Sequence, residues 1–538
     1  MRKVCVLLLV FIVYCIRAAV IVVDGNIPIT TNTTWTSDNI YLLVGEVVVR
    51  NATLTIEPGT IIKGDYNVVS RLIITNTAKI IARGTPEKPI IFTSNRPPGQ
   101  RKRGDWGGIS IAGNAPLNTY NPQGQFVQKL FECGVPPDYL YGGNNPDDSS
   151  GVLSYVRIEY AGYTCGTNSE LNSLSLGAVG RKTQIDHVMI SYSLDDAFEI
   201  WGGNVNLRYI VAYSTRDDDF DTDNGWTGFA QFGLIVKEDS VADEGDPSNG
   251  FESDNDDQSS YSKPYTSGVI SNFTCVGPAK TKTSPISENH GWAARIRRNS
   301  AQSIFNSIFM GYRQGIRFEG IGTQNKFNND TIEFKNNIVA GSVERNWVSS
   351  IDSIVLYSSK NNNRIYGGNA NDFVKLVEPF DINNFNFLPQ NNSPALSGSS
   401  FENDGPGSGG KLGSWFKRVS YVGAFGPNDN WLAGWTNFNP QFENYSSISE
   451  TNNLVKEWSI YPNPAKEKIN LLVTASEERE ALIEILNLDG RVVSSEKYLL
   501  QATSNIISLS VGHLPQALYF IRIQAGDEVY CAKASVTK

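Results

Sequence analysis

Short apolar segments with the pattern of β-strands recur at regular intervals along this chain. The segment 54–63 (LTIEPGTIIK) is echoed one repeat later by 72–81 (LIITNTAKII). A second motif recurs as YVRIEY, HVMISY and YIVAY at residues 155–160, 187–192 and 209–213, and similar segments follow at 267–273, 303–309 and 331–339. Repeats of about twenty residues are too short to bury their own apolar side chains, so neighbouring repeats must stack. This periodicity restricts the chain to a solenoid.

The pattern of residue types along the repeats indicates which kind of solenoid forms. From residue 21 to about residue 438, β-branched and aromatic runs alternate with clusters of Gly, Asn, Asp and Pro, and long amphipathic helical patterns are absent. A β-propeller would need repeats about twice as long, and a β-sandwich would not repeat. We therefore expect an all-β fold, a right-handed parallel β-helix.

Residues 1–18 have the composition of a secretory signal peptide. Arg2 and Lys3 precede an apolar run from residue 4 to residue 16, and Ala18 offers a small residue for cleavage. The apolar run is shorter than a bilayer span, so we expect no transmembrane segment after cleavage. Cleavage removes three basic residues and no acidic ones, which moves the net charge from -9 to -12.

The acidic net charge and the cysteines narrow the class of partner. A negative surface argues against nucleic acid as the main partner and is compatible with cation binding. Four cysteines remain after signal cleavage: Cys133, Cys165, Cys275 and Cys531. In an oxidising compartment, Cys133 and Cys165 could form a disulfide across an insertion, and isolated buried thiols are the open alternative.

The C-terminal region, 457–538, carries three ordered motifs. These are YPNP at 461–464, ALIEILNLDGR at 481–491 and LPQALYFIRI at 514–523, and the chain closes on Lys538. The region resembles the type A C-terminal sorting domain of the type IX secretion system, with Ala517 in place of the usual glycine. The residues that carry the sorting motif are Pro462, Asn463, Pro464, Asp489, Gly490 and Lys538.

This resemblance implies a small β-sandwich that the type IX machinery recognises after the signal peptide has delivered the chain to the periplasm. It implies a final location outside the cell or on its outer surface. The sorting domain is usually removed, and the cargo is released or attached to surface lipopolysaccharide. Residues 439–456, rich in Asn, Ser, Glu and Thr, are predicted to be a linker into this domain.

The region from 19 to 438 resembles a family of secreted β-helix proteins that commonly carry this sorting domain. The matching segments are 104–118, 151–162, 218–225, 249–256 and 423–431. The resemblance implies the fold and the location of the body. It implies no particular activity.

The sequence DDDFDTDNG at 217–225 is the strongest chemical signal in the body. Alternate residues of an extended segment share a face, which places four carboxylates in one row: Asp217, Asp219, Asp221 and Asp223. Such a row is unstable unless cations offset it. Calcium prefers about six to eight oxygen ligands, and the D-x-D-x-D spacing supplies several. Asn224 stands where an EF-hand needs glycine, so that motif is excluded.

Sliding the chain by one repeat places Asp195 on Asp217, Phe198 on Phe220 and Glu199 on Asp221. Positions one repeat apart stack at about 4.8 Å in a solenoid, so the carboxylates should form columns. Glu252, Asp254 and Asp256 show the same alternation and could close the site from a loop. We expect a calcium site, with a solvated acidic turn as the alternative. The predicted ligands are Asp195, Asp196, Glu199, Asp217, Asp219, Asp221, Asp223, Glu252, Asp254 and Asp256.

Polysaccharide cleavage is the competing function, because parallel β-helices host pectate lyases and polygalacturonases. A lyase would need a base beside calcium, and no motif ties Arg208, Arg216 or Lys237 to the acidic cluster. A hydrolase would need two spaced carboxylates, for which only Asp195 and Asp196 offer themselves. We therefore predict no catalytic residues.

The remaining histidine and arginine motifs favour structural roles. His187 fills a repeated strand position that tyrosine also occupies, which favours packing. Arg295 and Arg297 are expected to lie at a rung edge or to pair with nearby acids. The sequence thus predicts an adhesive β-helix that binds a glycan or protein, with a lyase or hydrolase of acidic polysaccharide as the alternative. Trp106, Trp201, Trp226 and Trp292 could line a binding face or stack internally.

Overall fold

A computed structural model describes residues 19–134, 137–166, 169–348, 361–401, 410–445, 455–475, 477–487, 491–525 and 528–538. The chain divides into two compact units, residues 1–447 and 448–538. The predicted signal peptide lies outside the described residues, as do Asp489, Gly490 and residues 446–454 of the predicted linker.

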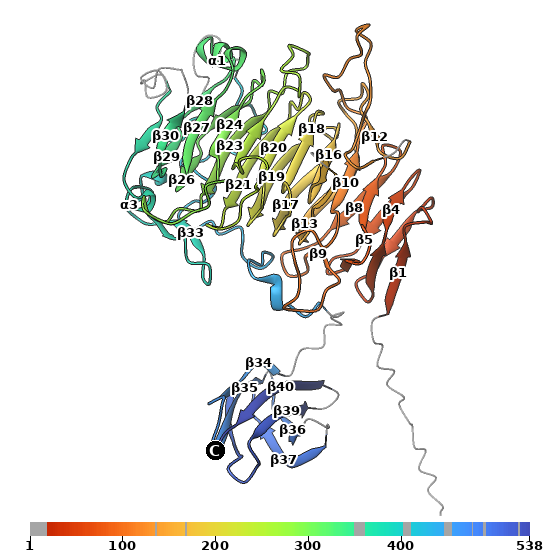
Figure 1. The fold of residues 1–538 in the computed structure, drawn as a ribbon, viewed down its shortest axis with the longest axis vertical. Coiled ribbons are helices and arrows are strands. Elements are labelled where there is room, and N and C mark those ends of the chain that lie inside the picture. Colours follow the sequence, from red (N-terminus) through yellow and green to blue (C-terminus); the bar gives the residue numbers. More distant parts are fainter. Residues whose placement is uncertain are drawn as a thin grey trace, which may run out of the picture. The chain divides into compact units, whose positions relative to one another are not determined.

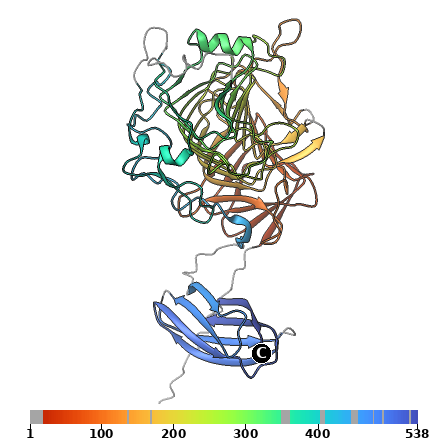
Figure 2. The ribbon, with the colours of Figure 1, turned by 60° about the vertical axis from the view of Figure 1, so that its left-hand side comes forward.

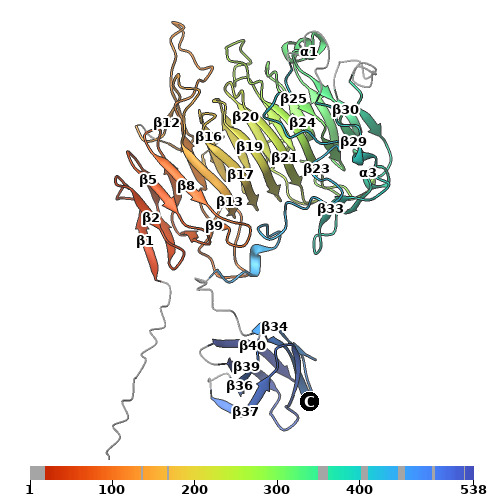
Figure 3. The same ribbon diagram turned by 180° about the vertical axis from the view of Figure 1, so that it is seen from behind.

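The larger unit is a stack of parallel strands in two long sheets (Figure 1, Figure 3). One wall of the stack is a ten-stranded parallel sheet. Its strands are β4 (Glu46–Val49), β7 (Arg71–Ile74), β10 (Ile109–Ala112), β16 (Leu174–Gly177), β18 (Phe198–Trp201), β20 (Phe220–Asp223), β22 (Phe251–Ser253), β24 (Trp292–Ile296), β27 (Gln314–Phe318) and β30 (Arg345–Val348).

The second, seventeen-stranded sheet supplies the other two walls, because its central strands bend. Each of these strands turns at one residue of positive φ: Tyr155, His187, Tyr209, Phe232 and Asn272. The bent strands are β13 (Gly151–Glu159), β17 (Gln184–Ser191), β19 (Asn206–Tyr213), β21 (Phe229–Val236) and β23 (Val269–Val276). The predicted parallel β-helix is therefore confirmed.

In the earlier and later rungs each bent strand is replaced by two shorter ones. The early strands are β1 (Val20–Asp24), β2 (Thr33–Trp35), β3 (Ile40–Val44), β5 (Thr53–Ile56), β6 (Ile61–Gly64), β8 (Lys79–Arg83) and β9 (Ile90–Ser94). The late ones are β25 (Ser303–Phe305), β26 (Ile308–Met310), β28 (Phe334–Lys335), β29 (Ile338–Ala340) and β31 (Arg364–Tyr366). A helix, α1 (Ile321–Asn328), follows β27.

One apolar core fills the space between the three walls. Figure 2 shows the walls more nearly end-on. Leu153 and Ile158 enter it from the two halves of β13, and Phe198 enters it from the ten-stranded sheet. These side chains are fully buried. Stacking therefore buries the apolar side chains that a single repeat is too short to cover, because each rung covers those of the next.

A ladder of aromatic rings follows the bend of the long strands on the outside of the core. His187 stacks on Tyr155 with ring centroids 4.2 Å apart and on Tyr209 at 4.6 Å, and Tyr209 stacks on Phe232 at 5.1 Å. Trp435 packs edge-on against the His187 ring. The prediction that His187 packs in a repeated strand position is confirmed.

Residues 410–445 form a strap that runs back along the solenoid. Lys411 donates to Ser303 in a late rung, and the carbonyl of Tyr421 accepts from Asn272. Further on, Tyr445 receives a hydrogen bond from Arg157, in a much earlier rung. The described parallel strands end at β31, so the last part of the region 19–438, expected to be β-helix, instead returns across rungs already built.

Short elements connect the last rung to the strap: α3 (Ala370–Val374), β32 (Leu376–Glu378), β33 (Asn386–Pro389) and η1 (Pro394–Leu396). The strap itself contains η2 (Pro440–Phe442). Two hairpins decorate the early rungs: β11 (Lys129–Leu130) with β12 (Leu140–Tyr141), and β14 (Tyr163–Gly166) with β15 (Ser169–Leu171). Cys133 and Cys165 join these hairpins in a disulfide, with Cα atoms 6.2 Å apart. The structure thus resolves a pairing that the sequence left open.

The smaller unit consists of two antiparallel sheets around one core. The first contains β34 (Val455–Tyr461), β35 (Lys468–Ala475) and β38 (Ser504–Ser510). The second contains β36 (Arg479–Leu486), β37 (Val492–Leu500), β39 (Ala517–Ala525) and β40 (Glu528–Val536). The sorting motif ties this fold together, because the Asn463 side chain accepts the backbone N–H of Ser535. Among the described residues, no helix has the length and apolar character needed to cross a membrane.

Candidate metal centre

Five carboxylates converge on the outer face of the ten-stranded sheet, at β18 and β20 and at the turns that lead into them. They form two overlapping groups, Asp195 with Asp196 and Asp217, and Asp196 with Glu199 and Asp221. Within each group the ligand atoms lie within 4.8 Å of one another. Asp196 belongs to both groups. We call these five residues the acidic cluster.

The register of the sheet creates the cluster. Glu199 of β18 pairs directly with Asp221 of β20, and Phe198 pairs with Phe220. The two phenylalanine side chains point inward with ring centroids 6.1 Å apart, so the acidic residues that follow them point outward. The one-repeat offset read from the sequence is therefore the register of the structure.

A ladder of hydrogen bonds fixes the turns beneath the cluster. The side chain of Asn172 accepts the N–H of Asp196 at 3.2 Å, and Asp196 Oδ1 accepts the N–H of Asp218 at 2.8 Å. Asp218 accepts from Asn249, whose own side chain accepts the N–H of Trp292 at 2.9 Å. Each side chain thus satisfies a backbone donor one rung further on. Asp196 is thus held in place through its Oδ1.

Electrostatics make the acidic cluster unstable without compensation. Burial raises the pKa of all five carboxyls well above the ordinary value, and neighbouring carboxylates raise it further. Oδ1 of Asp217 and Oδ1 of Asp221 are buried and have no hydrogen-bond partner among the described residues. Crowded carboxylates of this kind need a cation, or protons, to neutralise them. Oxygen-only ligands suit a hard divalent cation.

Two further acidic residues add to the negative electrostatic potential at the acidic cluster. Glu132 and Glu170, in the hairpins joined by the disulfide, raise the pKa of Asp195. Glu132 also accepts the backbone N–H of Glu170 at 2.8 Å. Sequence reasoning missed both residues, because they lie in an insertion outside the repeat. The spacing of the repeats gives no signal for them.

Five of the ten predicted ligands do not join the acidic cluster: Asp219, Asp223, Asp256, Glu252 and Asp254. Asp219 is fully buried and its carboxylate lies 3.3 Å from Nζ of Lys237, so it departs from the single face expected for the row. Asp223 accepts the backbone N–H of Asn224. Asp256 closes its own loop by accepting the N–H of Ser260 at 2.8 Å.

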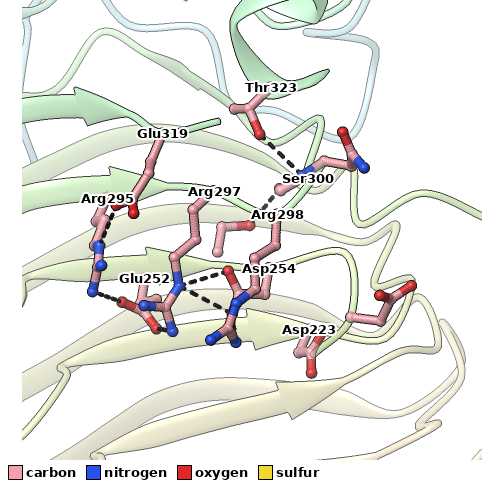
Figure 4. Close-up of polar contacts among 12 residues, drawn as sticks. Asp223, Glu252, Asp254, Arg295, Arg297, Arg298, Ser300, Glu319 and Thr323 are labelled. Carbon is pink, nitrogen blue, oxygen red and sulfur yellow. Dashed lines mark hydrogen bonds and ion pairs between the residues drawn. The ribbon is translucent and has the colours of Figure 1, made fainter. Parts of the chain in front are cut away.

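Glu252 and Asp254 lie on the next rung and bind arginines instead (Figure 4). Glu252 belongs to β22 and pairs in register with Asp221, so it does not come from a loop as expected. Nε of Arg297 lies 2.8 Å from Asp254, and Nη1 of Arg298 lies 2.7 Å from the same carboxylate. The expectation that the basic run pairs with nearby acids is confirmed.

The outer face of the sheet therefore changes sign along one column. Glu199, Asp221 and Glu252 occupy three successive strands, and the next two strands place arginines at the same position, Arg295 and Arg317. Arg295 joins the two halves of this face by contacting Glu252 at 3.3 Å and Glu319 at 2.9 Å. Carboxylates at the acidic end have no such partner among the described residues.

Two of the bases considered from the sequence are occupied by ion pairs. Arg216 pairs with Asp243 at 2.9 Å, and Lys237 with Asp219. His290 is buried between backbone carbonyls, and burial lowers its pKa to about 4. Burial opposes the charge on Arg297, but Glu252 and Asp254 outweigh it and raise the pKa of Arg297, which holds the proton in place.

The four tryptophans considered as a binding face pack inside the fold. Trp106 and Trp226 are fully buried. Trp201 packs against Phe131, and Trp292 is covered by the guanidinium of Arg295 at 4.7 Å. Internal stacking, the alternative drawn from the sequence, is what the structure contains.

The fold and the site together define a class of protein, a parallel β-helix with a separate antiparallel β-domain at its C-terminus. A family model described as a pectate-lyase-like β-helix domain matches residues 27–376, more than half of the chain. The chain belongs to this family. A second model, described as a secretion system C-terminal sorting domain, matches residues 459–537. The protein is thus a type IX secretion cargo that is directed to the cell surface or the extracellular space.

Comparison with other proteins adds two structural likenesses. The enzymatically active domain of tailspike protein 4 from bacteriophage CBA120 shares 12% identity at a TM-score of 0.26, over 96% of this chain and 63% of that chain. Full-length tailspike protein 2 from an Escherichia coli O157:H7 bacteriophage, CAB120, shares 10% identity at a TM-score of 0.18, over 92% and 64%. The chain spans less than two thirds of each tailspike. No curated protein matches it.

Proposed function

We propose that the protein is a calcium-stabilised β-helix of the cell surface that binds an extracellular glycan without cleaving it. The observation that carries the proposal is the acidic cluster, whose ligand oxygens lie within 4.8 Å of one another in each group. Lys237 and Arg297 offset the charge of Asp217 and Asp221 only in part, because the pKa of both carboxyls stays well above the ordinary value. Calcium fits because it takes about six to eight oxygen ligands in flexible geometry, and water or glycan hydroxyls would complete the set.

Binding is favoured over catalysis by the state of the neighbouring bases. Arg295, Arg297 and Arg298 all make ion pairs with carboxylates, and an arginine base would have to lose its proton to act. A strand spacing of about 4.8 Å also places Arg295 two strands, roughly 10 Å, from Asp221. The arginines thus serve the surface as fixed charges.

The experiment combines calcium titration with a glycan screen of the secreted chain. Calcium should raise the melting temperature and be required for glycan retention, with no new reducing or unsaturated ends. Glu199→Gln and Asp221→Asn should each weaken calcium binding, whereas the exposed Asp257→Asn should leave it unchanged. If neither calcium nor a chelator changes the melting temperature, the calcium site is not part of the function.

A lyase or hydrolase of acidic polysaccharide is the second candidate. Supporting it is the position of the arginines, which share the outer face of the ten-stranded sheet with the acidic cluster. Incubation with polygalacturonate and other uronate polymers tests this directly. Cleavage that disappears in Asp196→Ala or Asp221→Ala would replace the binding proposal with an enzymatic one.

A further inference from the structure

A cavity of about 460 Å³ opens on a different wall of the solenoid, over the first halves of β17 and β19. Figure 3 labels these two strands. Its lining includes Gln184, Asp186, His187, Arg208 and Trp415. Cavities of roughly 300–1,000 Å³ are typical of small-molecule sites. None of these side chains belongs to the acidic cluster.

Arg208 is the notable group in this cavity. Its guanidinium stacks on the Trp415 ring at 4.2 Å and donates to the backbone carbonyl of Trp415. Its Nε is buried without a hydrogen-bond partner among the described residues. Burial lowers the pKa of Arg208. Tyr209 and Asp186, the latter in register with Arg208 on the neighbouring strand, offset this in part. A half-buried guanidinium with an unpaired donor is a ready receptor for an anion.

The carboxylate nearest to Arg208 is already in use. Burial raises the pKa of Asp186, but hydrogen bonds from His187, Gln184 and Ser154 outweigh it and lower that pKa. These bonds measure 2.8, 2.6 and 2.7 Å. Asp186 therefore stays ionised and directed at its own neighbours. It orients Gln184 and His187, and its negative charge also favours the charged form of Arg208.

The rim of the cavity is basic in a chain that is acidic overall. Arg181 and Lys182 share a single partner, Asp147, at 2.6 and 3.5 Å, and more than half of each basic side chain is exposed. Arg83 extends the basic edge by donating to Gln184 at 3.1 Å. Four cations thus face two carboxylates here, whereas the whole chain carries a net charge of -9.

We propose that this cavity is a second ligand site, which binds an acidic saccharide by its carboxylate or sulfate group. Arg208 takes the anionic group, since its planar fork matches such oxygens. Trp415 is only half-buried and offers the sugar an apolar edge, and Gln184 offers amide hydrogen bonds to hydroxyls. The site lies apart from the proposed calcium-dependent one and needs no metal.

The test is calorimetric titration of the secreted chain with oligogalacturonate, a sulfated heparin oligosaccharide and a neutral maltooligosaccharide. At least one acidic probe should bind and weaken with salt, and the neutral probe should not. Arg208→Gln should weaken that binding by about tenfold or more, and Arg208→Lys by less. The preferred acidic probe distinguishes carboxylate from sulfate.

Matched variants keep the result clear. Arg313→Gln removes a surface arginine that pairs with Glu344 elsewhere, and it should bind like the wild type. If Arg208→Gln fails to fold, the exposed pair Arg181→Ala and Lys182→Ala should still reduce affinity. The proposal is overturned if the neutral probe binds equally, if no acidic probe binds, or if folded Arg208→Gln retains its affinity. It is also overturned if Asp221→Asn alone abolishes binding.

Discussion

The carboxylate of Asp219 lies 3.3 Å from Nζ of Lys237, and both side chains are completely buried. The neighbouring rungs have Ala197 and Gly250 at the level of Asp219, so this one rung replaces a small residue with a charge. Burial raises the pKa of Asp219 to about 7, and attraction to Lys237 opposes that rise. The pair is a local structural element, separate from the acidic cluster beside it.

Removing one partner of this pair should be much more costly than removing both. Lys237→Met leaves a buried carboxylate alone, which costs about 3–5 kcal/mol of unfolding free energy. The double variant Asp219→Ala with Lys237→Met should lose less than the sum of the single changes. Urea unfolding of the four proteins measures the coupling, with the exposed Lys280→Met as control. Additive losses would contradict the pairing.

Calcium affinity should rise with pH. The five carboxyls of the acidic cluster have raised pKa values, so protons compete with the metal until the pH exceeds those values. Without calcium the folded chain binds more protons than the unfolded chain above about pH 4, so its stability falls as pH rises. Calorimetry at several pH values, with and without chelator, tests both trends. A pH-independent affinity would contradict the assignment.

His290 should make the β-helix sensitive to acid. Burial lowers its pKa to about 4, against 6.5 for an unperturbed histidine, so the unfolded chain takes up the proton first as pH falls. The contribution of His290 to the free energy of unfolding is therefore full above pH 6.5 and is lost toward pH 4, by about 3 kcal/mol. His290→Gln should flatten this part of the profile. His513→Gln, in the sorting domain, should not.

The aromatic ladder should tolerate tyrosine at position 187 and resist alanine. Tyr155 and Tyr209 stack on the two faces of His187, so His187→Ala removes both contacts and should cost about 1–3 kcal/mol. His187→Tyr restores the stack and should stay close to the wild type. Thermal unfolding compares the two. Equal losses from both substitutions would show that the ladder contributes little.

Much of the fold could be predicted from the sequence, because residues that lie one repeat apart in the sequence become direct neighbours on adjacent strands. The one-repeat offset determined which acids would meet, and Glu199 does lie on Asp221. The aromatic position of His187 followed from the same logic. A parallel solenoid is the case in which positions in the sequence translate directly into neighbours in space.

The rest of the site depends on contacts between residues whose spacing in the sequence does not follow the repeat. Lys237 reaches Asp219 from the opposite sheet, and Glu132 approaches Asp195 from an insertion. Alternation alone placed Asp219 on the outer row, but the chain still turns at that residue and the strand begins at Phe220. Only the three-dimensional path of the turn decides which side the first carboxylate faces.

The strap carries a consequence for how the chain folds. Repeat proteins generally build up rung by rung from local contacts, so partial chains can be ordered. Here Arg101, in an early rung, donates to the carbonyls of Pro440 and Glu443, which come near the end of the strap and far later in the sequence. Contacts of such long range form late. The early rungs therefore gain their last contacts only when the strap, just ahead of the sorting domain in the sequence, is in place. Folding of the β-helix is thus completed only when nearly all of the chain before the sorting domain is present.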